Sequence, residues 1–201
     1  NAVTIADAGA FSASLGSKVL IKTLTASSSS TLSFVDGAAS VVLDSTYPIY
    51  KFEFIDIHPA TDAAEFQFQG NAAGGSGYNE TITSTGFAPR HSEDDTSEVG
   101  MSYQSANDKA QGTTFQDIFL NAGNANDECI SGFLTLFNPS STTFVKHFIS
   151  RVQGSHNANS SFEYFFAGYF NTTAAIDEIR FQMSSGNIDA GKIKLYGIKD
   201  S

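Results

Sequence analysis

The stretch YPIYKFEFIDI, residues 47–57, alternates apolar and charged side chains through its middle. Phe52 and Phe54 fall on one side of an extended chain, whereas Lys51 and Glu53 fall on the other. Because successive side chains of a β-strand point to opposite faces, this pattern predicts a strand with one buried face and one wet face. Such a strand suits an antiparallel sheet that packs against a core on one side.

Short runs of this kind recur along the chain, separated by clusters of Ser, Gly, Asn and Asp, and no segment has the periodicity of an amphipathic helix. We therefore predict an all-β protein, an antiparallel β-sandwich or jelly roll of about a dozen strands. The predicted domain covers residues 18–201, and residues 1–17, rich in Ala, Ser and Gly, are expected to form an extended arm. The candidate strands are residues 18–25, 30–36, 39–43, 47–57, 64–69, 78–85, 99–104, 113–120, 130–137, 142–153, 161–170, 176–183 and 192–198.

Two of these segments, 130–137 and 161–170, are apolar almost throughout. We expect them to be central in the sheet or covered on both faces, and double covering in a small domain suggests packing against another subunit. Pro139 directly follows Asn138, which predicts a type I turn and a local hairpin. Longer loops are predicted at residues 70–77, 87–98, 105–112 and 154–160.

The C-terminal segment SSGNIDAG, residues 184–191, is predicted to turn the chain in a closing hairpin. Gly186, Asn187 and Gly191 are available there for positive φ. Ile179, Phe181 and Met183 are expected to form one inward row and Ile193 and Leu195 the returning row, with Lys192 and Lys194 pointing the other way.

Composition excludes several classes of partner. The chain has 201 residues, with 11 Lys and Arg against 21 Asp and Glu, so its net charge is 11 − 21 = −10. A phosphate-binding surface needs a basic stripe, and Lys192, Lys194 and Lys199 are the nearest to a cluster, so we expect no nucleic acid partner. No apolar run approaches the ~18 residues of a membrane span, so we expect no membrane insertion.

Five residues at 91–98 are of the type that ligates hard cations. The loop HSEDDTSE has no alternating carboxylates around a Gly, so a solvated loop is favoured and cation binding stays open. The segment NAGNANDE, residues 121–128, is interpreted in the same way as turn chemistry. The five candidate ligands are His91, Glu93, Asp94, Asp95 and Glu98.

The remaining reactive side chains form no recognisable motif. The four histidines, at 58, 91, 147 and 156, are too widely spread for a local zinc motif, and His147 is expected to be partly buried. Cys129 is interpreted as a small buried apolar residue. We expect no catalytic residue, no cofactor and no metal ligand, and therefore a protein that is not an enzyme.

The 18 Phe and seven Tyr residues also suggest sugar binding, because aromatic faces stack on pyranose rings. Trp, the strongest platform for such stacking, is absent, and most Phe residues fall at core-facing positions. A Phe-filled core or subunit interface is therefore favoured. A carbohydrate-binding module that recognises a host-surface glycan remains an alternative.

The segment IDEIRFQMSSGNIDAGKIKLYGIK, residues 176–199, resembles the closing segment of virion structural proteins from tailed bacteriophages, especially marine phages of the cyanophage type. The resemblance extends to YKFEFIDIHPATD (50–62), GFLTLFNPSSTTFVKH (132–147) and GYFNTTAAIDEIRF (168–181). It implies a β-sandwich located on the virion after assembly in the host cytoplasm, commonly a homotrimer in contact with other virion subunits. It implies a tail-fibre or receptor-binding role in attachment or, alternatively, a capsid decoration or head-fibre role, and it supplies no catalytic residue.

Overall fold

The computed structural model describes residues 17–96 and 99–200, so the predicted arm lies outside the described residues except for Ser17. The described residues form twelve antiparallel strands, and the predicted all-β sandwich is confirmed. No helix in this part of the chain is long and apolar enough to cross a membrane. The strands are β1 (Lys18–Thr25), β2 (Leu32–Val35), β3 (Ile49–Pro59), β4 (Ala64–Ala72), β5 (Ile82–Ser92), β6 (Gly100–Tyr103), β7 (Gln116–Ala122), β8 (Ile130–Phe137), β9 (Lys146–His156), β10 (Ser160–Phe170), β11 (Ile176–Met183) and β12 (Ile188–Ile198).

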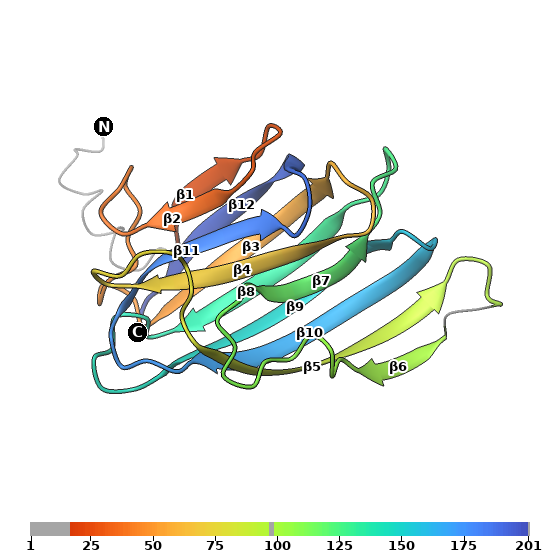
Figure 1. Ribbon diagram of the computed structural model, residues 1–201. Helices are drawn as coiled ribbons and strands as arrows, with labels where there is room; N and C mark the ends of the chain where they lie inside the picture. The colour runs from red at the N-terminus through yellow and green to blue at the C-terminus, as the bar shows by residue number, and fades with distance from the viewer. Residues whose placement is uncertain (1–16, 97–98, 201) are drawn as a thin grey trace, which may run out of the picture.

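The strands lie in two layers (Figure 1). Eight strands, in the order β1-β12-β3-β8-β9-β10-β5-β6, form what we call the large sheet, and β2-β11-β4-β7 form the small sheet. A single pairing between Ala122 of β7 and His156 of β9 joins the two. β12 therefore lies between β1 and β3, and β11 lies between β2 and β4.

Aromatic rings fill the space between the layers. Within the described part of the chain, eleven Phe residues are buried, as the alternation predicted. Phe181 of the small sheet is the centre of the largest cluster, with ring centroids 5.2–6.3 Å from those of Phe34, Phe52, Phe54, Phe66 and Phe68. Since the protein forms no disulfide, the burial of this apolar surface is the main source of its stability.

The face assignment of β3 is confirmed, because Tyr50, Phe52 and Phe54 are at most 2% exposed. In β4, Gln69 follows Phe68 in the alternation, so its side chain lies on the face of the strand opposite the Phe66 and Phe68 rings. Gln69 is fully buried, because the segments before β5 and before β7 cover the small sheet there. Its amide nitrogen donates to the carbonyl oxygens of Glu80 and Thr113, at 3.1 and 3.2 Å.

The predicted strand at 39–43 is not a strand. Ala39 and Ser40 have φ values of 49° and 68°, which break an extended chain. Val41 and Leu43 are nevertheless buried, so the apolar run contributes to the core from a loop. The Asp36 carboxylate accepts the Leu43 N–H at 2.8 Å and fixes the loop.

Several predicted strand ends are also wrong. Residues 87–92, predicted in a loop, belong to β5, because β5 pairs with β10 from Ile82 to Ser92. Likewise β9 begins at Lys146, not at 142, and β12 begins at Ile188, not at 192. Each of these strands extends as far as the strand that it pairs with, and the local composition does not predict that length.

The predicted hairpin at Pro139 is confirmed, because β8 and β9 pair and Ser141 N donates to Asn138 O at 3.1 Å. The predicted closing hairpin is wrong, although both of its inward rows are buried. β11 pairs with β4 and β2, whereas β12 pairs with β1 and β3, so the chain crosses between the layers. Gly186 and Gly191 have positive φ as predicted, but Asn187 does not.

The buried phenol of Tyr50 predicts how stability depends on pH. Its hydroxyl donates to Asp44 O at 2.9 Å, and burial, with a smaller effect of the Asp44 carboxylate, raises the pKa of Tyr50 well above 10.0. A pKa raised by folding gives stability that is complete below the unfolded value and is lost as the pH rises towards the folded value. We expect the free energy of unfolding to fall between about pH 10 and about pH 12, and less steeply in Tyr50→Phe.

Urea denaturation at intervals across this pH range measures the effect. Tyr50→Phe removes both the ionisable group and the hydrogen bond, so its stability is also expected to be about 1 kcal/mol lower at neutral pH. Parallel alkaline curves for the two proteins would exclude Tyr50 as the source.

Candidate functional site

The face of the large sheet that points away from the small sheet is the candidate site, and we call it the outer face. All the strands that the structure describes are accounted for in the two layers, so none of them packs over the outer face. β8 and β10 are central, as predicted, but no described strand covers their second side. Their outward side chains are half-buried aromatic residues, namely Phe133, Phe137, Phe165 and Tyr169.

Cations lie over several of these outward rings. The Nζ of Lys18 is 3.9 Å from the centroid of the Tyr196 ring, and the Nζ of Lys51 is 4.3 Å from that of Phe133. Arg151 lies over another ring of the same face, that of Phe165, at 5.2 Å. The alkyl stems of these side chains cover apolar surface while the charges stay in water.

Two glutamates partly balance this charge. The Glu53 carboxylate lies 2.5 Å from Lys18 Nζ and 3.4 Å from Lys51 Nζ, and Glu163 lies 2.5 Å from Arg151 Nε. Partial burial favours a higher pKa for Glu53, but the hydrogen bonds and charges of the lysines outweigh it, so the pKa lies below its usual value. These ion pairs leave the aromatic rings as the dominant feature of this region.

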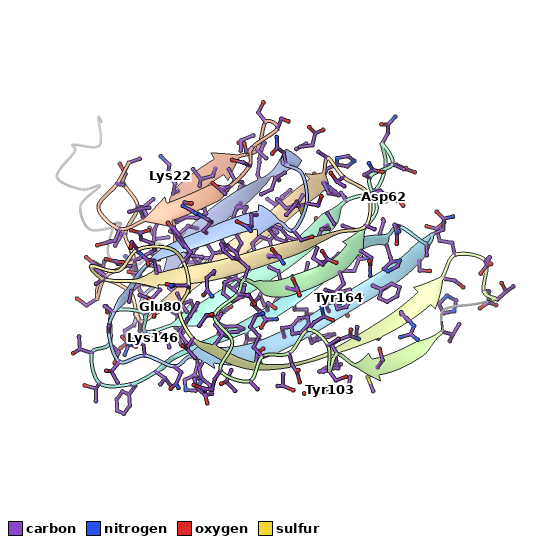
Figure 2. The ribbon with its side chains drawn as sticks, in the orientation of Figure 1. Lys22, Asp62, Glu80, Tyr103, Lys146 and Tyr164 are labelled. Atoms are coloured by element: carbon purple, nitrogen blue, oxygen red, sulfur yellow. The ribbon has the colours of Figure 1, made fainter. Side chains whose placement is uncertain are left out.

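One edge of the outer face exposes apolar side chains, and we call Phe87, Met101 and Tyr103 the assembly patch. They are 43%, 73% and 58% exposed, and Phe87 pairs across the sheet with Tyr103. The Phe87 ring stacks on Phe165, with centroids 4.7 Å apart. Tyr103, labelled in Figure 2, is the last residue of β6, which is the edge strand of the large sheet.

A groove of about 520 Å³ lies at the other end of β5 and β10. Ala167 and Gly168 of β10 line it together with larger residues of the neighbouring strands. A Cβ at Gly168 would lie only 2.4 Å from the Thr83 carbonyl oxygen, so the close approach of β5 requires glycine. The larger side chains that line the groove are Thr83, Thr85, Phe137, His147, Ile149 and Tyr169.

His147 is exposed on this face, so the prediction that it is partly buried is wrong. Phe148 points into the core, which places His147 and Ile149 outward, where no described strand packs. The His147 ring contacts the Tyr169 ring, with centroids 5.8 Å apart. His147 is therefore a surface residue of the groove.

The other histidines have separate local partners. A ring nitrogen of His58 lies 3.1 Å from the Ala125 carbonyl oxygen. The His156 ring stacks on Phe162 at 4.4 Å. Each of these two rings thus has a local contact of its own.

The predicted acidic loop is only partly a loop, since His91 belongs to β5. His91 Nε2 lies 3.2 Å from Asp95 Oδ1 in a largely exposed pair. Asp94 accepts hydrogen bonds from the Ser92 hydroxyl at 2.7 Å and from the N–H and hydroxyl of Thr96 at 3.0 and 2.7 Å. These contacts use the Asp94 carboxylate to close a turn.

Within residues 17–96 and 99–200, no three His, Cys, Asp or Glu side chains are placed to hold a metal ion. Glu98 lies outside the described residues, so cation binding by this loop stays a prediction. In the second candidate segment, Ala125 N donates to Glu128 Oε2 at 2.7 Å, which closes a turn after β7. This contact agrees with the interpretation of that segment as turn chemistry.

Cys129 is half-buried, and its Sγ lies 4.0 Å from Asp56 Oδ1. Burial, and secondly the Asp56 carboxylate, raises the pKa of the Cys129 thiol above 9.0. A catalytic cysteine needs a lowered pKa, because the thiolate is the nucleophile. The environment of Cys129 therefore disfavours a catalytic role.

We found no family model, no curated protein and no solved structure that matches this chain.

The sequence did not point to the groove as a site. Its lining combines the consecutive strands β8, β9 and β10 with β5, which lies far from them in the sequence. One local signal was present, because Ala167 stands at an outward position between the aromatic residues Phe165 and Tyr169. A small residue at such a position indicates a depression in the surface of a sheet.

Proposed function

We propose that this protein is a non-enzymatic structural subunit of a tailed-phage virion, in the tail-fibre or receptor-binding assembly, with a role in host attachment. The outer face of the large sheet carries this proposal, because it combines rings, cations and exposed apolar side chains. Contiguous exposed apolar surface marks interaction sites. The resemblance of four segments to tailed-phage virion proteins supports the same role.

The assembly patch supports association between copies of the chain. Met101 and Tyr103 lie on β6, whose residues GMSY carry no charge, so burial of β6 itself removes no charged side chain of this strand from water. Aromatic residues and Met are enriched in protein interfaces. We propose that the patch is buried between copies in a homotrimer, the state that the resemblance implies.

Localisation on the intact particle tests the proposed role. Cryo-electron microscopy of the virion, with an antibody against this chain, should show it as discrete density at the tail. Even labelling over the capsid would contradict the tail assignment and move the protein to a decoration or head-fibre role. No labelling of the particle would reject the virion proposal as a whole.

The substitution Met101→Glu tests the assembly patch. We expect the wild-type protein to have about three times the chain mass of 21.4 kDa in light scattering after size-exclusion chromatography. Met101→Glu should shift the protein towards a single chain, because a charge buried without a partner opposes association.

Phe144→Glu is the matched control, since Phe144 is 69% exposed in the loop between β8 and β9, away from β6. It should leave the mass unchanged. A wild-type protein of single-chain mass, or equal effects of the two substitutions, would contradict the assignment of the assembly patch.

A further inference from the structure

We infer that the groove on the outer face binds an uncharged saccharide. This inference rests on the proposed function. It names the class of host-surface molecule that the attachment subunit recognises. The volume of about 520 Å³ falls within the usual range for ligand pockets of ~300–1,000 Å³.

The aromatic residues of the groove supply the apolar contacts. Tyr169 and Phe137 are half-buried, and the small Ala167 leaves space above the sheet between the larger side chains. An aromatic ring carries negative charge on its face, which attracts the polarised C–H bonds on one side of a pyranose. Rings held by a rigid sheet bind at low cost in conformational entropy.

Polar groups at the same site require a ligand that carries hydroxyls. Gln111 Nε2 donates to Thr83 Oγ1 at 2.7 Å, and Gln111 is itself held by Asn171 Nδ2 at 2.6 Å. With this lone pair used, the Thr83 hydroxyl proton is free to donate to a ligand. A purely apolar ligand would leave such groups without hydrogen bonds, at a cost in affinity.

Two further polar side chains complete the site. The Thr85 hydroxyl donates to Tyr103 Oη at 3.4 Å, which leaves lone pairs on Thr85 Oγ1 to accept. The His147 ring offers one donor and one acceptor in its neutral form. The groove therefore offers both donors and acceptors beside its apolar part, as hydroxyl recognition requires.

Charge determines the class of saccharide. The side chains that line the groove include no Lys, Arg, Asp or Glu. The net charge of −10 for the whole chain also repels polyanions at long range. An acidic polysaccharide would find no Lys or Arg in the groove to pair with its carboxylates, whereas an uncharged one needs no such partner.

Affinity electrophoresis of the full chain measures this binding, through gels that contain dextran, mannan, laminarin or the acidic polymer alginate. We expect retardation by at least one of the three neutral polymers and none by alginate. Tyr169→Ala, and Ala167→Phe, which fills the groove, should each weaken retardation about tenfold or more. Thr83→Val should weaken it several-fold, because it removes one hydrogen-bond donor.

Tyr196→Ala is the matched control, since it removes a half-buried tyrosine from the same face outside the groove. It should leave retardation unchanged, and thermal melts should show that all variants are folded. Retardation by alginate alone, no retardation by any neutral polymer, or an equal loss in Tyr196→Ala would overturn the inference. Tail localisation without saccharide binding would reject the groove alone, and binding without virion localisation would reject the proposed function alone.

Discussion

Replacing Phe181 with Ala is expected to lower the free energy of unfolding by about 3–5 kcal/mol. The Phe181 ring is fully buried and contacts five other Phe rings, from both layers of the sandwich. Its removal forfeits the transfer free energy of the ring and leaves a cavity that rigid strands on two sides cannot close. Urea denaturation followed by intrinsic tyrosine fluorescence measures the change.

Phe144→Ala provides the comparison, because this ring is 69% exposed in a loop. Its free energy of unfolding should stay within about 0.5 kcal/mol of the wild-type value. If Phe181→Ala lowered the free energy of unfolding by less than about 1 kcal/mol, that result would contradict the packing of the two layers through this ring.

A still larger effect is expected from Leu195→Asp. Leu195 is fully buried on β12 and pairs across the sheet with Phe52, so the substitution places a carboxylate in the aromatic core. A buried charge without a partner costs several kcal/mol, which is comparable with the whole stability of a domain. We expect Leu195→Asp to yield no folded protein, as judged by circular dichroism and by loss of the soluble fraction.

Lys194→Asp is the control for that experiment, since it introduces an aspartate one position earlier, on the outer face. It should fold and lose about 1 kcal/mol or less, because it only places like charge opposite Glu53. Leu195→Ala should fold with a loss of about 2–5 kcal/mol, which separates burial of charge from loss of packing. A soluble, folded Leu195→Asp protein would contradict the inward row of β12.

Much of the fold follows from alternation alone. The period of two placed Phe52 and Phe54 inward in β3 and Ile193 and Leu195 inward in β12, and the structure has them there. The period fails where a second layer of loops covers the surface, as at Gln69. Alternation of apolar and polar residues predicts which apolar side chains face the core. It does not identify a polar side chain that is buried because backbone carbonyl oxygens accept its hydrogen bonds.

The sequence predicted the hairpin between β8 and β9 but not how β11 and β12 connect. Residues 184–191 contain the glycines of a turn, and neighbouring strands in the sequence often pair, so a hairpin was expected. The structure instead sends β11 and β12 to different layers, where each pairs with strands made much earlier. Pairing partners at such distances are set by the packing of the whole core, which local composition does not encode.

The candidate site was hidden from the sequence for the same reason. Thr83, Phe137 and Tyr169 come together only through the registers of β5, β8, β9 and β10. If the register of one of these strands shifted by one residue, the groove side chain on that strand would point into the core instead. The assembly patch depends likewise on the pairing of Phe87 with Tyr103.

The positions of β11 and β12 have a consequence for synthesis of the protein. β1 and β2 lie at the edges of their layers, and their partners β12 and β11 are made after all the other described strands. β1 and β2 therefore cannot pair as in the native structure until β11 and β12 have left the ribosome. We expect folding of the sandwich to be slow, as for other proteins dominated by long-range pairing. A chaperone that shields unpaired strands would then raise the yield of native protein, and a truncation before residue 176 would yield none.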